Sequence, residues 1–216
     1  MTSGVIQPAS ERGAIAEAAA ILREGGLVVF PTDTVYGVGA YALLPDAIEA
    51  IYRAKLRPRD KAIPVLLSQT TEISHVARNI PDIAWAIAER FWPGGLTLVL
   101  AKAPHLPDIL CAGGESIAVR VPDHAVALAL IAALSGPLAA TSANLSGDAP
   151  ATTAAEAAAA LGGQVAMILD GGQSPMGVAS TVLDLTADPP RILRQGAIPA
   201  EALASFLAQC GVKLAS

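Results

Sequence analysis

The chain has 216 residues, of which 53% are hydrophobic, 15% charged and 4% aromatic, and its 14 Lys and Arg against 19 Asp and Glu give a formal net charge of −5. This composition excludes a disordered chain and a general coat for nucleic acid, and the length is enough to bury one sizeable core. No uncharged apolar run reaches the roughly 18 residues of a membrane span, and residues 1–10 lack the basic start and apolar core of a secretory signal.

Apolar residues recur with helical and strand periodicity along the chain. A helix over 11–24, capped by Ser10, is expected to end at Gly25-Gly26, and a buried strand follows over 27–30. The pattern then predicts, in chain order, a helix over 45–56, a strand over 63–67, a helix over 81–91, and strands over 96–101 and 116–122. After these it predicts a helix capped by Asp123, a strand over 137–141, and a helix capped by Thr152 or Thr153 and ending at Leu161. The last predicted elements are strands over 165–170, 180–185 and 191–194 and a helix over 199–209. This alternation predicts an α/β fold whose twisted sheet mixes parallel and antiparallel strands and is flanked by helices.

The remaining bulk features limit the chemistry. No internal repeat or long linker divides the chain, so residues 1–216 are expected to form one domain. Cys111 and Cys210 are too few and too far apart for a disulfide framework or a zinc site, which favours a reducing, cytoplasmic compartment. There is no Gly-Lys pair of a phosphate-binding loop and no Gly-x-Ser-x-Gly elbow, and the three histidines lack metal-ligand spacing, so no metal site is expected.

The densest group of charges is the segment Arg53-Ala-Lys55-Leu-Arg57-Pro-Arg59-Asp-Lys61, which holds five cations in nine residues. Pro58 ends the preceding helix, so the segment turns toward the strand at 63–67. Cations held at such a junction can converge on a phosphate chain, with Lys as a point charge and Arg as a bidentate fork. The alternative is a solvated basic turn.

Two polar segments directly follow apolar strands, the position at which open α/β sheets bind ligands. Residues 31–39, PTDTVYGVG, offer threonine hydroxyls to a small polar substrate and glycines for close backbone approach, or else form an Asx turn. In the second segment, 140–147, Ser142 and Asn144 are two residues apart. A continued strand would place them on one face to hold phosphate, ribose or base edges, and the alternative is an ordinary loop that caps the next helix.

Arg120 and Arg194 are each the lone charge within an apolar strand pattern. Because arginine is rarely buried without a partner, each needs an anion. The partner is either a structural carboxylate, Asp33 or Asp184, or the carboxylate or phosphate of a substrate. The segment 91–95, FWPGG, is expected to be a structural turn behind an aromatic anchor.

Together these motifs resemble the YrdC-like family of threonylcarbamoyl-AMP synthases over about residues 12–198. The matching segments are PTDTVYGVG (31–39), KLRPRDK (55–61), FWPGGLTLVL (91–100), IAVRVPDH (117–124), TSANLSG (141–147), STVLDL (180–185) and ILRQGAI (192–198). Each segment is weak alone, but their order and spacing are specific. Many members have Lys-Pro-Leu where this chain has Lys61-Ala62-Ile63, and some have His where it has Leu66.

The resemblance implies a concave, electropositive cavity in which ATP, L-threonine and bicarbonate give threonylcarbamoyl-adenylate and pyrophosphate. ATP is then a substrate, with Mg2+ held mainly by its phosphates. The partner implied is a downstream tRNA threonylcarbamoyl transferase, which modifies the adenosine beside the anticodon; a weak direct tRNA contact stays open. Longer members append a second domain, and a chain ending at Ser216 is expected to be the form with the catalytic domain only.

The resemblance also assigns site residues. The family signature of Lys, Arg, Ser and Asn maps onto Lys55, Arg57, Ser142 and Asn144, the catalytic set. Contacts with ATP are implied for these four and for Lys61, Ser116 and Arg194, and contacts with threonine for Thr34, Arg120 and Ser180. Two alternatives remain: a non-catalytic module that binds tRNA or double-stranded RNA, and a paralogue acting on another carbamoyl or acyl substrate. Threonine-dependent pyrophosphate release distinguishes all three.

Overall fold

The computed structural model describes residues 4–215, which form a single mixed sheet covered by helices. Its strands are β1 (Val5–Pro8), β2 (Val28–Phe30), β3 (Gly37–Tyr41), β4 (Val65–Leu66), β5 (Ala77–Arg78), β6 (Leu96–Lys102), β7 (Ser116–Arg120), β8 (Leu138–Ser142), β9 (Met167–Asp170), β10 (Thr181–Asp184) and β11 (Arg191–Arg194). Their order is β1-β9-β2-β3-β8-β4-β7-β6-β10-β11, with β5 paired to β6. Parallel pairs such as β2–β9 and β6–β10 stand beside antiparallel pairs such as β3–β8 and β6–β7, which confirms the predicted mixed sheet.

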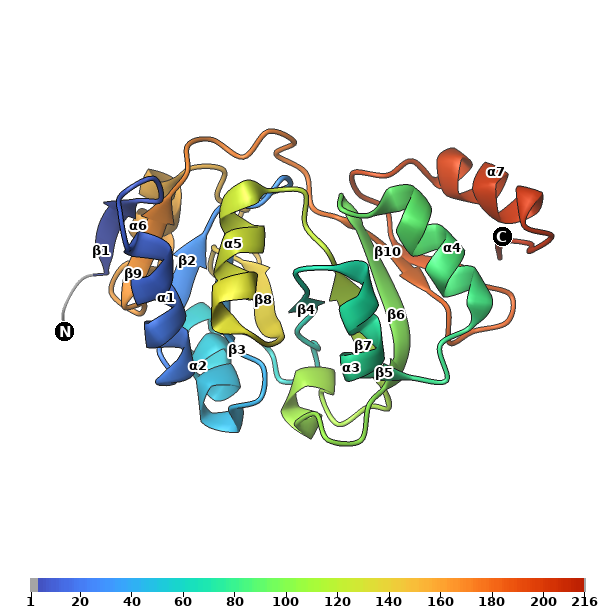
Figure 1. Cartoon of the computed structure of the whole chain (residues 1–216), viewed down its shortest axis with the longest axis horizontal. Helices are drawn as coiled ribbons and strands as arrows, with labels where there is room; N and C mark the ends of the chain where they lie inside the picture. Colours follow the sequence, from blue (N-terminus) through green and yellow to red (C-terminus); the bar gives the residue numbers. More distant parts are fainter. Residues whose placement is uncertain (1–3, 216) are drawn as a thin grey trace.

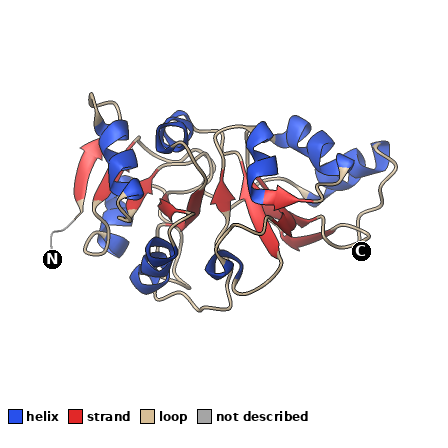
Figure 2. Ribbon diagram, turned by 60° about the horizontal axis from the view of Figure 1, so that its bottom comes forward, coloured by secondary structure: helices blue, strands red, loops and turns tan. Residues whose placement is uncertain are grey.

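The helices lie along both faces of this sheet, and the molecule is elongated along the direction in which the strands succeed one another (Figures 1 and 2). They are α1 (Ala14–Arg23), α2 (Pro45–Lys55), α3 (Ile73–Val76), α4 (Asp82–Phe91), α5 (Ala125–Leu134), α6 (Ala154–Leu161) and α7 (Ala200–Gln209). The described ends of the chain lie at opposite ends of the molecule in Figure 1. Within residues 4–215 no helix is both long enough and apolar enough to cross a membrane.

The strands of one half of the sheet are apolar on both faces because both faces are covered. In β2, Val28 and Phe30 pack into a cluster formed with α1 and α5, whereas Val29 packs into the larger core on the other face. Met167 and Ile168 of β9 divide in the same way. Side chains of a strand alternate between faces, so a strand buried on both sides has an uninterrupted apolar run. This is why runs such as residues 27–30 are recognisable in the sequence.

The main difference from prediction is β3, for which the sequence pattern indicated no strand. In the structure Gly37 and Gly39 pair with β2 on one side and β8 on the other. A Cβ at Gly37 would lie 3.2 Å from the ring of Phe30, and one at Gly39 would lie 2.9 Å from it. The glycines therefore allow the Phe30 ring to approach an internal strand, a close approach of a core side chain in addition to the predicted approach to a ligand.

Helix caps were predicted less well than the helices themselves. The residue before α1 is Gly13, with φ of 92°, and not Ser10. The N-cap of α5 is His124, whose Nδ1 accepts a hydrogen bond from the Val126 amide, and not Asp123. Of the two candidates before α6, Thr153 is the cap, in a reciprocal capping box with Glu156. Several polar residues precede each helix, and only the backbone path selects among them.

Candidate active site

A cavity of about 430 Å³ opens across the middle of the sheet, where β3 and β8 face β6, β7, β10 and β11. This volume is within the range of small-molecule sites. Its apolar walls come mostly from strand residues such as Leu66, Val99 and Ala118. Its polar lining consists of Thr32, Thr34, Tyr36, Arg57, Thr97, Ser116, Arg120, Thr141, Ser142, Ser180 and Arg194. No Asp or Glu is among the described residues that line it.

Arg120, at the end of β7, is held from three directions. Its Nη2 pairs with the Asp33 carboxylate, its Nε donates to the Gly94 carbonyl at 2.8 Å, and its Nη1 donates to Thr34 Oγ1 at 2.9 Å. Arg120 is 6% exposed and Asp33 2% exposed, so the pair is buried. Of the two carboxylates predicted as partners, the structure selects Asp33. Because a guanidinium has five N–H donors, two remain for a ligand.

The electrostatics of this pair keep Arg120 charged. Burial lowers the pKa of Arg120, and the nearby Asp33 carboxylate opposes that effect. Gly94 belongs to the segment 91–95, whose Trp92 indole donates to the Leu96 carbonyl at 2.6 Å. The predicted structural turn therefore also orients the arginine. One Asp33 oxygen, Oδ2, is buried and makes no hydrogen bond to a described residue.

In the segment before β3, the turn is held by hydrogen bonds to the side chain of Thr32 and not to that of Asp33. Thr32 Oγ1 accepts from the amides of Thr34 and Val35 at 3.2 and 3.3 Å, whereas Asp33 Oδ1 accepts from Arg120 and from the Asp123 amide. The predicted Asx turn is therefore a threonine turn. With its backbone held by Thr32, the segment is free to direct the Asp33 carboxylate toward Arg120.

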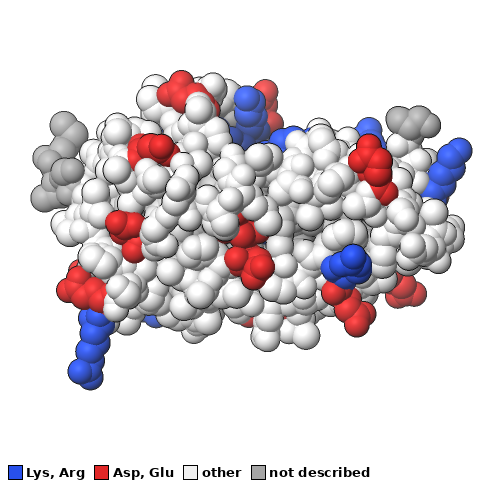
Figure 3. Space-filling view, turned by 90° about the horizontal axis from the view of Figure 1, so that it is seen from above, with Lys and Arg blue, Asp and Glu red and all other residues white. Residues whose placement is uncertain are grey.

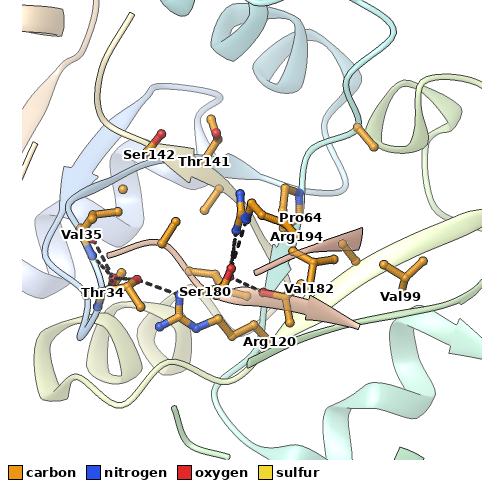
Figure 4. Close-up of a pocket in the computed structure, with 18 of the residues that line it drawn as sticks. Thr34, Val35, Pro64, Val99, Arg120, Thr141, Ser142, Ser180, Val182 and Arg194 are labelled. Carbon is orange, nitrogen blue, oxygen red and sulfur yellow. Dashed lines mark hydrogen bonds between the residues drawn. The ribbon is translucent and has the colours of Figure 1, made fainter. Parts of the chain in front are cut away.

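Arg194, on β11, lies on the opposite side of Ser180 from Arg120 (Figure 4). Its Nη2 donates to the Ser180 carbonyl at 2.8 Å and to Ser180 Oγ at 3.1 Å, and Ser180 Oγ lies 2.8 Å from Thr97 Oγ1. The prediction of an internal arginine in an apolar strand is wrong here, because β11 ends the strand order and Arg194 is exposed. Asp184, its predicted partner, pairs instead with Arg191 at 3.1 Å.

Arg57 is the third arginine of the cavity. Its Nε donates to the Lys61 carbonyl at 3.1 Å and its Nη2 to the Ala62 carbonyl at 2.7 Å. Among the ion pairs of residues 4–215, neither Arg57 nor Arg194 has a carboxylate partner. Partial burial, and then the charge of Arg57, lower the pKa of Arg194. Two uncompensated cations that repel each other across a cavity are an arrangement that can bind an anion.

The other cations of the basic segment do not line the cavity. Arg59 pairs with Glu49, and Arg53 and Lys61 are exposed. Lys55 is 1% exposed, and its Nζ donates to the carbonyls of Ser142, at 2.5 Å, and Asn144. Burial, and then the charge of Arg57, lower the pKa of Lys55 to about 8. Lys55 thus ties the end of α2 to the loop after β8.

Comparison with known proteins places this chain in a family. Residues 20–196 match the family model Sua5_yciO_yrdC, whose description is "Telomere recombination". The chain belongs to the Sua5/YciO/YrdC family. Its sequence is 43% identical over 192 residues to the threonylcarbamoyl-AMP synthase of Pyrococcus abyssi, covering 89% of this chain and 56% of the relative. It is 40% identical over 209 residues to a putative threonylcarbamoyl-AMP synthase of Mycobacterium tuberculosis H37Rv, covering 97% and 94%.

Solved structures agree with the family assignment. The crystal structure of P. abyssi Sua5 complexed with L-threonine superposes with a TM-score of 0.91 at 40% sequence identity, covering 100% of this chain and 62% of that one. The structure of Escherichia coli YciO has a TM-score of 0.80 at 28% identity. The chain spans about half the length of the P. abyssi and Bacillus subtilis relatives, 56% in each case.

Most of the family's signature positions lie at the cavity, but they do not all face it. Arg57, Ser116, Ser142 and Arg194 line it together with Thr34, Arg120 and Ser180. Lys55, Lys61 and Asn144 lie outside the lining. The strand β8 ends at Ser142, so Asn144 does not share its face as predicted for a continued strand. Its amide Nδ2 donates instead to the carbonyls of Leu145 and Asp148.

Four polar lining residues are absent from the predicted site residues: Thr32, Tyr36, Thr97 and Thr141. Thr97 is the only hydroxyl in the apolar run 96–101, which is a usable signal because a buried hydroxyl needs a partner. Tyr36 is fully buried, and its hydroxyl donates to the Gly172 carbonyl at 2.6 Å. An isolated tyrosine near glycines carries no such signal.

The backbone of Ser180 packs against Gly196 so closely that Gly196→Ala is expected to destabilise the protein. A Cβ at Gly196 would lie 2.2 Å from the Ala179 carbonyl oxygen and 2.5 Å from backbone atoms of Ser180. Backbone atoms cannot rotate away, so we expect a loss of about 2 kcal/mol or more in the free energy of unfolding, measured by denaturant titration. Gly163→Ala is the matched control, because no atom lies within 4 Å of its Cβ position. Equal stability of the two variants would contradict the prediction.

Proposed function

We propose that this chain is a threonylcarbamoyl-AMP synthase, which condenses L-threonine, bicarbonate and ATP to L-threonylcarbamoyladenylate and pyrophosphate. The observation that carries the proposal is the division of one cavity between two unpaired arginines, Arg57 and Arg194, and a third, Arg120, grouped with buried hydroxyls. The first pair fits a polyphosphate, and the second group fits a small hydroxylated amino acid. The names of the relatives support the same activity.

The amino-acid subsite is proposed at Arg120, Thr34 and Ser180. The two remaining N–H donors of Arg120 would bind the threonine carboxylate, with Thr34 and Ser180 beside its amine and hydroxyl. The likeness to Sua5 with bound L-threonine supports this assignment. Because all three side chains are buried and already hydrogen-bonded, little ordering is left to occur when threonine binds.

The ATP subsite is proposed around Arg57 and Arg194. Their charges would neutralise the triphosphate, and Ser116 and Ser142 would offer hydroxyls from the opposite walls. Lys61 is exposed next to the lining residue Ala62, from which its long side chain can reach a phosphate. Lys55 and Asn144 are assigned to the same subsite, where Lys55 holds the carbonyls of Ser142 and Asn144, and the Asn144 side chain holds those of Leu145 and Asp148. Since the described lining offers no carboxylate, Mg2+ would be held mainly by the phosphates.

The reaction then needs alignment more than proton transfer. The neutral threonine amine attacks the carbon of CO2 derived from bicarbonate, and the N–C bond forms as one C=O π bond breaks toward oxygen. The proton lost from nitrogen combines with the hydroxide released from bicarbonate to give water, which leaves a carbamate. A carbamate oxygen attacks the α-phosphorus, forms the new P–O bond and displaces pyrophosphate with its bonding electrons. Preorganised cations that face the developing charge, and reactants held in line, each contribute several kcal/mol to such a transfer.

The proposal also includes the downstream partner, the cellular compartment and the extent of the domain. The product would pass to a tRNA threonylcarbamoyl transferase in the cytoplasm, and residues 1–216 would act as one catalytic domain. The face seen in Figure 3 does not favour a role as an RNA-binding module. In Figure 3, Lys and Arg side chains are widely spaced on a largely uncharged face and form no continuous track for a phosphate backbone.

The test is to incubate the purified chain with ATP, Mg2+, bicarbonate and each amino acid in turn, and to measure pyrophosphate and the mass of the adenylate. We expect pyrophosphate release that depends on L-threonine and on bicarbonate. Release that depends on another amino or carbamoyl donor would indicate a paralogue. Salt-sensitive binding of tRNA with no pyrophosphate release would indicate the RNA-binding module.

A further inference from the structure

Thr32 is a buried polar residue of the motif 31–39 to which the proposed reaction assigns no role. It lies two residues before Thr34, and the two are 4% and 1% exposed. Its Oγ1 lies 2.6 Å from the Val35 carbonyl oxygen and 2.9 Å from Thr34 Oγ1. These two contacts determine which hydroxyl donates and which accepts in a short chain of hydrogen bonds that ends at the cavity.

The carbonyl contact decides which way the chain runs. A carbonyl oxygen can only accept, so a separation of 2.6 Å requires that Thr32 donate its single hydroxyl proton to Val35. The Thr32 proton is then not available to Thr34. Thr32 Oγ1 also accepts from the amides of Thr34 and Val35 at 3.2 and 3.3 Å, two long contacts that share one lone pair. Its second lone pair then faces Thr34 Oγ1 at 2.9 Å, so Thr34 is the donor of that hydrogen bond.

Arg120 completes the arrangement at Thr34. Its Nη1 donates to Thr34 Oγ1 at 2.9 Å, and a guanidinium has no lone pair with which to accept. Thr34 Oγ1 therefore donates its one hydrogen bond to Thr32 and uses one of its two lone pairs to accept a hydrogen bond from Arg120. What it presents to the cavity is its second lone pair, so it can only accept a hydrogen bond from a ligand.

We propose that Thr32 is a positioning residue that makes Thr34 an acceptor for the α-amino group of the amino-acid substrate. This inference rests on the proposed function. A carboxylate has no proton to donate at Thr34, whereas the free N–H groups of Arg120 lie beside it and suit a carboxylate. Amine and carboxylate share one carbon, so a ligand whose carboxylate contacts Arg120 brings its amine to Thr34. The direction of one buried hydroxyl thereby selects an α-amino acid over its deaminated analogue.

The test compares two ligands and three variants. L-Threonine and 3-hydroxybutanoate of matching configuration differ only in the α-amine, and the dissociation constant of each is measured by NMR titration without ATP. In Thr32→Val the Thr34 hydroxyl loses its acceptor and can rotate toward the ligand as a donor. We expect the preference for threonine over 3-hydroxybutanoate to fall about fivefold to tenfold in this variant. Thr32→Ser, which keeps the hydroxyl, should retain the wild-type preference within about twofold.

A merely structural role predicts a different result, since it weakens both ligands equally. Equal losses in Thr32→Val, or a loss of preference in Thr32→Ser, would overturn the inference and leave the proposed function intact. Wild-type protein that binds neither ligand would overturn both. Because Thr32 also holds the turn, Thr32→Asn is the third variant: its carbonyl oxygen can accept from Thr34 and its amide can donate to Val35. Loss of preference in a folded Thr32→Asn protein also contradicts the inference.

Discussion

Arg57→Ala is expected to lower threonine-dependent pyrophosphate release by at least about a hundredfold, which corresponds to about 3 kcal/mol of transition-state stabilisation. The side chain is aimed by the carbonyls of Lys61 and Ala62, and within residues 4–215 it has no carboxylate partner. Its charge is therefore available to the phosphates of ATP as they take up negative charge. Steady-state kinetics with ATP and threonine varied separately measure the effect.

The control for Arg57 is its neighbour Arg59, which lies in the same basic segment but pairs with Glu49 at the surface. Such an exposed pair contributes about 0–1 kcal/mol, so Arg59→Ala should change activity and stability little. Equal losses in the two variants would mean that the charge of the whole segment, and not the aim of Arg57, supports activity. Arg57→Lys should recover only part of the rate, because an ammonium lacks the bidentate fork.

Arg120→Ala is expected to lower both stability and activity, for separable reasons. Removal of one partner of a buried ion pair leaves the Asp33 carboxylate buried without a counter-charge, which costs about 3–5 kcal/mol of unfolding free energy. Thr34 also loses the donor that holds it, and the proposed carboxylate contact disappears. Thermal or denaturant unfolding measures the first effect, and threonine titration measures the second.

The double variant Arg120→Met with Asp33→Leu separates these effects. With both charges removed, no carboxylate remains buried without a partner, so most of the lost stability should return. Threonine-dependent turnover should stay at the level of Arg120→Ala. A double variant that regains turnover together with stability would show that Arg120 serves only the fold and does not contact the amino acid.

Much of the local structure was predictable because its causes are local. The helices α1, α2, α4 and α7 begin and end within about three residues of their predicted ends, since their apolar residues repeat with helical period. The segments 96–101 and 116–122 form β6 and β7 for the corresponding reason. The strand β3 was not predictable, because its glycines form a strand only through pairing with β2 and β8 and through the position of Phe30.

In the candidate site, too, the sequence predicted the residues, but the tertiary contacts decided their arrangement. Residue types and their order placed Arg57, Arg120, Thr34, Ser142 and Ser180 in one site, and all five line the cavity. Which cation faces the ligand was not readable: Lys55 and Lys61 belong to the same motif as Arg57, yet one is buried behind a loop and the other is exposed. A helix end and a turn decide this, and both depend on contacts with distant strands.

The low net charge of the chain illustrates what sequence and tertiary structure each determine. Composition alone established an apolar, weakly charged chain with few cations, and the motifs predicted the chemistry that those cations suit. Only the tertiary structure decided that Asp33, 87 residues away, neutralises Arg120 while Arg57 and Arg194 stay unpaired, and that Thr34 can only accept. Charge pairing and hydrogen-bond direction depend on distances of a few ångströms between segments remote in sequence, and those distances are set by the folding of the whole sheet.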